Sequence, residues 1–242
     1  MTQLFQSVAS LDLFETACCD RLSNQIWSGR FFHVLDMVDD GTAHVELLED
    51  GYRGFLAADV LTTPGVVAAV DRPPATRPAI AREEIELLLP QVMVRAQQAR
   101  EVTNTYLWGG NIGPNFDCSG LVQRSFTSAG IWVPRDSYQQ AEFCKPIGQS
   151  PPLPEDVEQL QPGDLLFFQF GQRVDHVAIY WGNGGYLHSS GSDRGHNGIA
   201  WDTIYPAATD AIACTYRDRI CRLGRVDRSL AFPAIDISLL PA

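Results

Sequence analysis

The 242-residue sequence has a single lysine, no long apolar run and no excess of positive charge. Lys145 is that lysine, and every other basic residue is arginine, which indicates a genomic bias more than a function. Acidic residues outnumber basic ones by 29 to 18, which gives a formal net charge of −11. Nucleic acids and anionic membranes are bound through clustered cations. We therefore expect neither of them as a partner.

No apolar stretch reaches the roughly 18 residues that a membrane span needs. The segment Met1–Ser7 has no basic region followed by an apolar one, so we expect no secretory signal and a cytoplasmic protein. The cysteines form neither a CxxC pair nor a Cys/His metal spacing, so we expect reduced thiols and no metal or cofactor. They are Cys18, Cys19, Cys118, Cys144, Cys214 and Cys221. With 45% hydrophobic and 19% charged residues, the chain can bury a core.

Residues 1–61 predict a first domain made of short strands. Segments 30–38 and 43–48 are rich in β-forming residues, and Asp39-Asp40-Gly41 between them is a turn signal. Several strands in so few residues predict a small closed β-barrel, because closure removes exposed strand edges. Residues 62–79 are rich in proline, which stiffens the chain, and they predict a semi-rigid linker.

Residues 80–230 predict a second, α+β domain, followed by a tail at 231–242. Apolar residues recur at helical spacing over 83–101, where Pro90 predicts a break or a kink. A second helix begins at Cys118 and presents one continuous apolar face. The period then becomes two, which predicts antiparallel strands. These lie at 165–170, 176–181, 186–190 and within 215–226.

Cys118 is the first candidate for a functional residue, because it follows a glycine-rich approach and begins a helix that Asn115 or Asp117 can cap. A helix N-terminus carries unpaired N–H groups and a partial positive charge. Both stabilise a thiolate, so we expect the pKa of this thiol to be lowered, and the N–H groups can also hold an oxyanion. The alternative is a small buried side chain without a chemical role.

His176 and His188 are the candidate bases, because they lie on the two strands of one predicted hairpin. His33 and His44 fall in the barrel, and His196 falls in a polar loop. A base beside Cys118 would take the thiol proton, and a second histidine would orient the first. The alternative is two ordinary strand histidines.

The register of this hairpin decides whether the two imidazoles can meet. A four-residue loop at 182–185 places them on opposite faces of the sheet. A three-residue loop or a bulge instead places His188 opposite Ala178, with His176 as its diagonal neighbour on the same face. A catalytic pair therefore requires an odd loop or a bulge.

The second domain resembles the NlpC/P60 cysteine peptidases over about residues 81–226. Four blocks carry the resemblance in the family's order. They are Asp117-Cys118-Ser119-Gly120-Leu121-Val122, Leu160 to Phe168 with its Pro162-Gly163-Asp164, Asp175-His176-Val177-Ala178-Ile179-Tyr180, and Tyr186-Leu187-His188-Ser189-Ser190. The resemblance implies a papain-like α+β fold in which Cys118 is the nucleophile, His176 the base and His188 the orienting group.

The resemblance extends to substrate and domain order. Such peptidases cleave the γ-D-glutamyl–diamino acid bond of bacterial wall peptides, and Tyr106 matches a tyrosine near their oxyanion site. Residues 1–61 resemble a bacterial SH3-like domain, as in cyanobacterial-type members that favour peptides with a free N-terminal L-alanine. The resemblance then implies that Tyr52, Asp117 and Ser119 bind that amino end. The alternatives are that Tyr52 is a barrel aromatic and that Tyr106 is a core aromatic.

We therefore expect a monomeric cysteine endopeptidase that acts on soluble murein peptides in wall recycling. The net charge of −11 fits a soluble fragment better than an intact anionic wall polymer. One alternative is an amidase or acyltransferase of the same fold, which shares the nucleophile but not the bond. Another is an inactive module that binds wall ligands.

Overall fold

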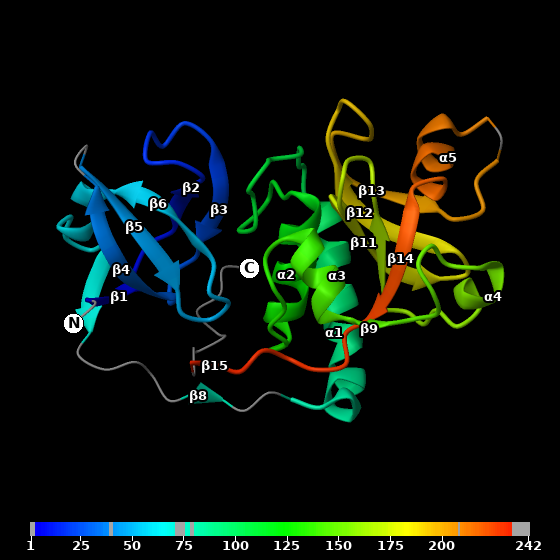
Figure 1. Cartoon of the computed structure of the whole chain (residues 1–242), viewed down its shortest axis with the longest axis horizontal. Coiled ribbons are helices and arrows are strands. Elements are labelled where there is room, and N and C mark those ends of the chain that lie inside the picture. Colours follow the sequence, from blue (N-terminus) through cyan, green and yellow to red (C-terminus); the bar gives the residue numbers. More distant parts are fainter. Residues whose placement is uncertain (1–2, 39–40, 71–75, 78–79, 208, 234–242) are drawn as a thin grey trace.

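The structure is a computed structural model that describes residues 3–38, 41–70, 76–77, 80–207 and 209–233 (Figure 1). Two domains lie side by side, and the N-terminal one is built of strands while the second combines helices and a sheet (Figure 1). Within the described part of the chain, no helix has the length and apolarity to span a membrane.

The first domain is one antiparallel sheet that wraps around an apolar core. Side chains alternate between buried and exposed along its strands, as in Leu11 and Leu13, because successive residues point to opposite faces. The order is β3-β2-β6-β5-β4-β1-β7, so β3 and β7 are the edges of the sheet. Among the described residues, no backbone hydrogen-bond ladder joins these two edges to close the barrel. Its elements are β1 (Leu4–Ser7), β2 (Leu11–Phe14), β3 (Leu22–Ile26), β4 (Phe31–Val38), β5 (Thr42–Leu47), β6 (Arg53–Ala57), the 3₁₀ helix η1 (Ala58–Leu61) and β7 (Val67–Val70).

The sheet of the first domain extends past residue 61, where the predicted domain ends. Strand β7 pairs with β1 along its whole length, so the barrel continues to Val70. The segment between the domains is also not only a spacer, because β8 (Thr76–Arg77) pairs with β15 (Phe232–Pro233) from the start of the predicted tail. The turn residues Asp39 and Asp40, the rest of the linker at 71–75 and 78–79, and tail residues 234–242 lie outside the described residues.

The second domain is a six-stranded antiparallel sheet in the order β13-β12-β11-β10-β14-β9. Alternation sends Leu165 and Phe167 into a core with three helices, and Leu166 and Phe168 into a second core on the opposite face. Its helices are α1 (Arg82–Glu101), α2 (Cys118–Ser128), α3 (Ser137–Phe143), α4 (Pro154–Val157) and α5 (Ala211–Arg217). Its strands are β9 (Lys145–Pro146), β10 (Leu165–Phe168), β11 (His176–Gly182), β12 (Gly185–Ser190), β13 (Gly198–Thr203) and β14 (Ile220–Arg225).

The structure settles one open question and adds one strand. Of the break or kink predicted at Pro90, the break does not occur: helix α1 runs through Pro90, because its buried face continues through Ile85, Leu89 and Val92 and can offset the roughly 3 kcal/mol cost of an internal proline. Residues 198–203, for which the sequence predicted no strand, form the edge strand β13, which pairs with β12 over its full length.

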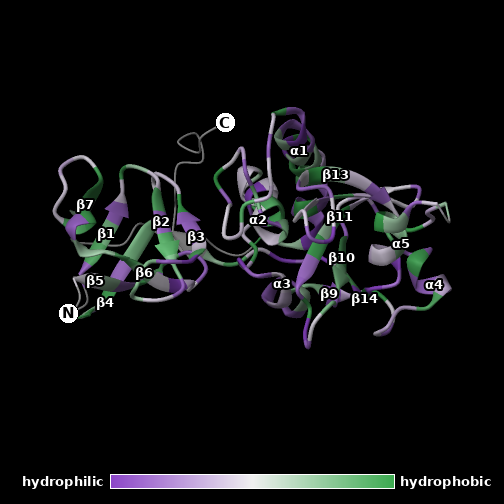
Figure 2. Ribbon diagram, turned by 90° about the horizontal axis from the view of Figure 1, so that it is seen from above, coloured by the Kyte–Doolittle hydropathy of each residue, from purple (hydrophilic) through white to green (hydrophobic). Residues whose placement is uncertain are grey.

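The domains are fastened together by an apolar contact and a polar one. Trp27 of the barrel packs against Trp132 at a centroid distance of 5.6 Å, and both rings are fully buried. The edge strand β3 faces the second domain, and the side-chain oxygens of its Asn24 and Gln25 accept hydrogen bonds from groups there. Figure 2 shows α2 on the side of the second domain that faces the barrel, so this junction lies next to the start of α2.

Candidate active site

Cys118 occupies the first turn of α2, as predicted, and the chain reaches it through a tightly packed loop. Gly109 has a φ of +78°, a left-handed conformation that favours glycine. The Gly110 carbonyl accepts a hydrogen bond from the Asp117 N–H at 3.0 Å. A side chain at Gly120 would lie 2.1 Å from the Gly110 oxygen, so only glycine allows the helix to begin this close to the loop. The Cys118 side chain lies at the floor of a cleft, 5% exposed.

Asp117 is the N-cap of α2, and its carboxylate binds a buried arginine. Its Oδ1 accepts from the Gly120 N–H at 2.6 Å, and its Oδ2 accepts from the Gly109 N–H at 2.9 Å. Arg135 donates to both oxygens, at 3.0 Å and 2.6 Å, and is 1% exposed. The helix start, the glycine loop and Arg135 are therefore held by one carboxylate, whose charge is compensated inside the protein.

The hairpin register that a histidine pair requires is present, which confirms that geometric prediction. Ile179 pairs with Leu187, whereas Gly182 pairs with Gly185, so a bulge lies between the two pairs. The bulge places both imidazoles on one face of the sheet. The Nε2 atom of His176 lies 2.7 Å from Nδ1 of His188, and the two side chains are buried.

Beyond His188 lies a carboxylate that the sequence did not single out. Oδ2 of Asp202, on β13, is 2.9 Å from Nε2 of His188 and 3.1 Å from Nε2 of His196. His188, His196 and Asp202 are also the one group of possible metal ligands found among the described residues, with ligand atoms within 4.8 Å of one another. Here these atoms are hydrogen-bonded to each other. The only signal in the sequence was the short alternation of residues 198–203, where Ile199 and Trp201 share one face.

Burial, not the helix terminus, dominates the pKa of the Cys118 thiol. Burial and the nearby Asp117 carboxylate raise the pKa of the Cys118 thiol to about 12, although the Val177 and Ser119 N–H groups and Arg135 favour the thiolate. The prediction that the pKa of the Cys118 thiol is lowered is therefore wrong for the protein without substrate. The pKa of His176 lies well below its ordinary value, because of burial and then of the neighbouring His188 and Arg194. At neutral pH the site thus holds a thiol and a neutral imidazole, the pair required for general-base transfer of the thiol proton.

Alkylation with iodoacetamide should report this protonation state. Since a raised pKa leaves little thiolate at neutral pH, the Cys118 rate should be low near pH 7 and rise steadily to about pH 10. Mass spectrometry of the Cys118 peptide gives the rate, with the exposed Cys18 in the same sample as the reference. A Cys118 rate that stays high and flat down to about pH 6 would instead indicate a preformed thiolate–imidazolium pair.

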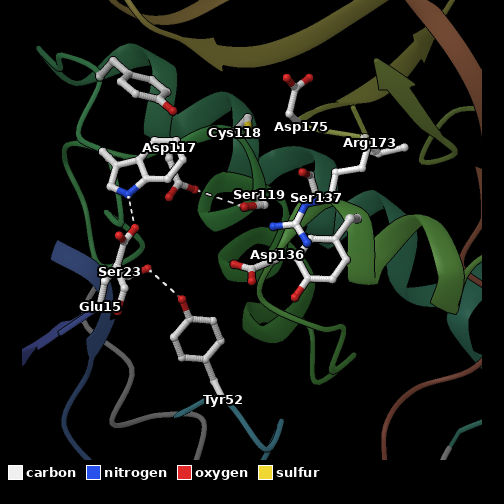
Figure 3. A pocket seen from close by; sticks show the side chains of 14 residues that line it. Glu15, Ser23, Tyr52, Asp117, Cys118, Ser119, Asp136, Ser137, Arg173 and Asp175 are labelled. Carbon is white, nitrogen blue, oxygen red and sulfur yellow. Dashed lines mark hydrogen bonds between the residues drawn. The ribbon is translucent and has the colours of Figure 1, made fainter. Parts of the chain in front are cut away.

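The cleft above Cys118 is lined by residues from both domains. The barrel contributes Tyr52, whose hydroxyl donates to the Ser23 carbonyl at 3.3 Å (Figure 3). The structure brings together all the predicted substrate-binding and oxyanion residues around this cleft. They are Tyr52, Tyr106, Asp117 and Ser119. Tyr106 also lines the adjoining hollow that contains His176, so the two hollows share a wall.

Acidic groups predominate at the barrel end of the cleft. Besides Asp117, this end is lined by Glu15 of the barrel and by Asp136, which has the cation Arg173 near it, whereas Asp175 lies toward the sheet (Figure 3). Glu15 Oε1 accepts from the Trp108 indole N–H at 3.2 Å, which ties the domains together at the rim. Burial raises the pKa of the Asp136 carboxyl above its ordinary value, with Arg135 opposing that effect. Sequence analysis missed Glu15 and Asp136, because neither belongs to the motif around the cysteine.

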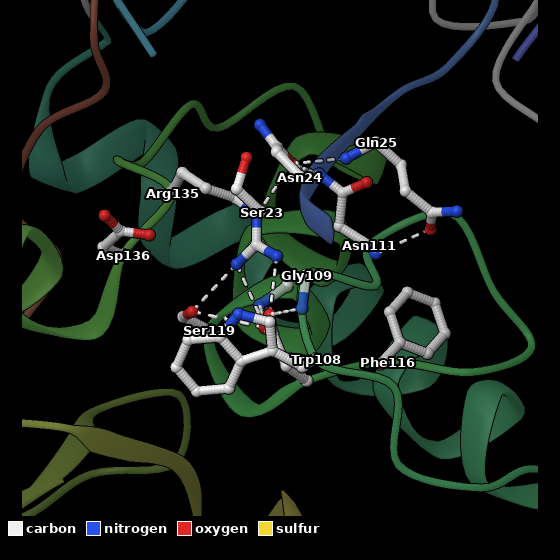
Figure 4. Close-up of polar contacts among 12 residues, drawn as sticks. Ser23, Asn24, Gln25, Trp108, Gly109, Asn111, Phe116, Ser119, Arg135 and Asp136 are labelled. Carbon is white, nitrogen blue, oxygen red and sulfur yellow. Dashed lines mark hydrogen bonds and ion pairs between the residues drawn. The ribbon is translucent and has the colours of Figure 1, made fainter. Parts of the chain in front are cut away.

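The floor of this end is fixed by side chains that cross the domain junction (Figure 4). The Asn24 side-chain oxygen accepts from Arg135 Nε at 2.8 Å and from Asn111 Nδ2 at 2.7 Å. Gln123 of α2 donates to Asp50 of the barrel at 2.8 Å. Arg135 therefore contacts both the N-cap of the cysteine helix and the barrel, so the barrel is part of the site's framework.

Comparisons with known proteins agree with this arrangement. Residues 103–208 match the NlpC/P60 family, and residues 13–61 match the family described as the bacterial dipeptidyl-peptidase Sh3 domain. The probable endopeptidase p60 of Listeria innocua is 36% identical over 112 residues, which are 46% of this chain and 21% of that protein. The gamma-D-glutamyl-L-lysine dipeptidyl-peptidase of Bacillus cereus is 40% identical over 92 residues, 37% of this chain and 25% of that protein.

The matched region thus spans about a fifth to a quarter of the length of these curated relatives. A solved NlpC/P60 family protein from Bacillus cereus covers 93% of this chain and 63% of its own, with 21% identity and a TM-score of 0.45. The chain therefore carries an NlpC/P60 domain and, before it, a bacterial SH3 domain.

Proposed function

We propose that the protein is a cysteine peptidase that hydrolyses the bond between the γ-carboxyl of D-glutamate and a diamino acid, in wall peptides with a free N-terminal L-alanine. The observation that carries the proposal is the position of the Cys118 thiol, which contacts the N–H of Val177, the residue after His176, and lines a cleft with an acidic end that the SH3 domain walls off. His176 is in turn hydrogen-bonded to His188. A relative named as a gamma-D-glutamyl-L-lysine dipeptidyl-peptidase supports the same bond.

The charge of the closed end supports recognition of an amino terminus. An ammonium group needs oxygen acceptors and negative charge. Asp117 lines this end, but its charge is already compensated by Arg135. Asp136 and Glu15, the latter also paired with the exposed Arg21 at 3.1 Å, supply further carboxylates, and the Tyr52 hydroxyl supplies a neutral acceptor. A short segment such as L-Ala-γ-D-Glu would then lie between this end and Cys118.

The chemistry follows from the positions of the rings. With His176 Nε2 turned to His188, its Nδ1 is the nitrogen available to take the Cys118 proton. The sulfur attacks the γ-carbonyl, and the first-turn N–H groups of α2, with Tyr106 nearby, stabilise the oxyanion. The proton passes from His176 to the leaving amine, which departs toward the hollow lined by His176. Water, activated by the same imidazole, then hydrolyses the thioester.

A soluble fragment fits the net charge of −11 better than an intact anionic polymer does, so we propose a role in wall recycling. On that proposal the protein works in the cytoplasm on free peptides and acts as a monomer. The substrate is then a small peptide with an L-Ala-γ-D-Glu-diamino acid sequence.

Digestion of defined tripeptides tests the proposal. L-Ala-γ-D-Glu-meso-diaminopimelate should give L-Ala-D-Glu and free diaminopimelate, both identified by mass spectrometry. N-acetylation removes the ammonium and leaves partly buried carboxylates without a partner, so kcat/KM should fall about 100-fold or more. Asp136→Asn should raise KM for the free peptide and reduce the penalty of acetylation, whereas Glu83→Gln, an exposed change on α1, should do neither.

Three results would contradict this reading. Equal rates on free and acetylated peptides would remove the amino-end pocket. Release of an ammonia or acyl-transfer product, without cleavage of the γ-glutamyl bond, would favour an amidase or an acyltransferase. Binding of the tripeptide without turnover would favour a binding module.

A further inference from the structure

His188, the second histidine of the pair, is hydrogen-bonded to a buried carboxylate. His188 pairs with Ala200 across β12 and β13, so Asp202, two residues along β13, projects from the same face. The Asp202 side chain is 2% exposed and that of His188 is fully buried. Oδ2 of Asp202 accepts hydrogen bonds from two ring nitrogens, Nε2 of His188 at 2.9 Å and Nε2 of His196 at 3.1 Å.

These contacts fix where the protons lie. A carboxylate can only accept a hydrogen bond, so the Nε2 of His188 must carry the proton that it donates. The neutral His188 ring then has a lone pair on Nδ1, which must accept from Nε2–H of His176 across the 2.7 Å contact. His176 is thereby left with a lone pair on Nδ1, the nitrogen available to Cys118.

We infer that Asp202 is a positioning residue that sets the tautomer of His188 and, through it, the tautomer in which His176 can act as a base. The inference rests on the proposed cysteine peptidase function and deepens it. Reversing the chain of hydrogen bonds would leave His176 with an N–H aimed at the thiol and no lone pair to take its proton. The proposed relay thus has four side chains in place of three, in the order Cys118, His176, His188 and Asp202.

The charge of Asp202 fits this role throughout the neutral range. Although burial opposes ionisation, the hydrogen bonds from His188 and His196 and their electrostatic interactions with the carboxylate hold the pKa of the Asp202 carboxyl below its ordinary value. Burial lowers the pKa of His188 despite the Asp202 contact, so that ring is neutral when the carboxylate is charged. A neutral ring has only one N–H, which makes its tautomer decisive.

His196 supports Asp202 from the solvent side. Its side chain is 32% exposed, and it belongs to the loop before β13. It occupies the same carboxylate oxygen as His188, so it restricts how the Asp202 side chain can rotate. Its N–H also offsets part of the cost of burying a charge.

Long-range ¹H–¹⁵N spectra of the histidine-labelled full-length protein test the inference without any substrate. Signals of His176 and His188 are assigned from the His176→Ala and His188→Ala spectra. Near pH 7 both rings should be neutral with the proton on Nε2. A His188 proton on Nδ1 in the wild-type protein would overturn the inference, even if the enzyme cleaves its substrate. Absence of turnover with the expected tautomers would refute the proposed function alone.

Kinetics provide the second readout. Asp202→Ala should populate the other His188 tautomer and lower kcat by about 100-fold or more with little change in KM, as a triad aspartate does when its loss permits the wrong tautomer. Asp218→Asn, which alters a surface carboxylate paired with Arg217, is the matched control and should leave both spectra and kcat unchanged. If Asp202→Ala keeps the wild-type tautomers and kcat, Asp202 does not position the relay.

Discussion

Cys118→Ala is expected to lower the hydrolysis of the tripeptide by about 10⁴-fold or more, because no other group in the cleft can form the thioester. The substitution removes one sulfur from the first turn of α2 and leaves the N-cap contacts of Asp117 in place. The melting temperature should therefore stay close to that of the wild-type protein. Tripeptide binding should also persist, so isothermal titration with the inactive variant would give the substrate's Kd directly.

Control variants separate the sulfur's chemistry from its packing. Cys18→Ala alters an exposed thiol of the barrel and should leave kcat unchanged. Cys144→Ala alters a buried thiol in the same core as Cys118, and should lower stability but not kcat. Turnover by Cys118→Ala within about tenfold of wild type would show that Cys118 is not the nucleophile, because loss of a covalent nucleophile lowers kcat by far more.

The predictable part of the site was set by local periodicity. The apolar face of α2 and the glycines before it placed Cys118 at a helix start. Because side chains alternate along a strand, the two histidines could meet only if the hairpin had an odd loop or a bulge. The bulge lies between Tyr180 and Gly182. Both are properties of neighbouring residues, which is why they could be derived before the structure was known.

The parts that escaped prediction depend on contacts between distant segments. Asp202 acts through β13, a strand whose pairing with β12 is visible only as a brief alternation. The pKa of Cys118 is set by burial, which no local rule about helix termini includes. Strand β7 was not predicted for the same reason, since it joins the barrel by pairing with β1 at the other end of the domain's sequence.

Arg135 shows how the two domains share one site, and its replacement should be the most damaging change outside the chemical relay. Its guanidinium binds both oxygens of Asp117, the Ser119 hydroxyl at 2.9 Å and the Asn24 side chain of the barrel. Arg135→Met keeps much of the apolar stem but leaves Asp117 buried without a counter-charge. Breaking a buried pair in this way costs about 3–5 kcal/mol of unfolding free energy.

A double-mutant cycle measured by urea unfolding checks this value. Asp117→Asn removes the charge that Arg135 compensates, so the Arg135→Met, Asp117→Asn double variant should be less destabilised than the sum of the two single variants. Arg53→Met, which breaks an exposed barrel pair with Glu46, is the matched control and should change stability little. Additive single effects would show that Arg135 and Asp117 do not act as a pair.

Activity should fall with stability in these variants, but for a separate reason. Without Arg135, the N-cap of α2 loses the group that joins it to Asn24, so both the thiol and the barrel wall can shift relative to the substrate. A misplacement of about 1 Å can cost about 100-fold in rate. In the folded Arg135→Met protein, kcat should therefore drop and the preference for a free amino terminus should weaken together. A lower kcat with the amine preference intact would mean that the barrel stays in place without Arg135, through contacts such as Trp27–Trp132 and Gln123–Asp50.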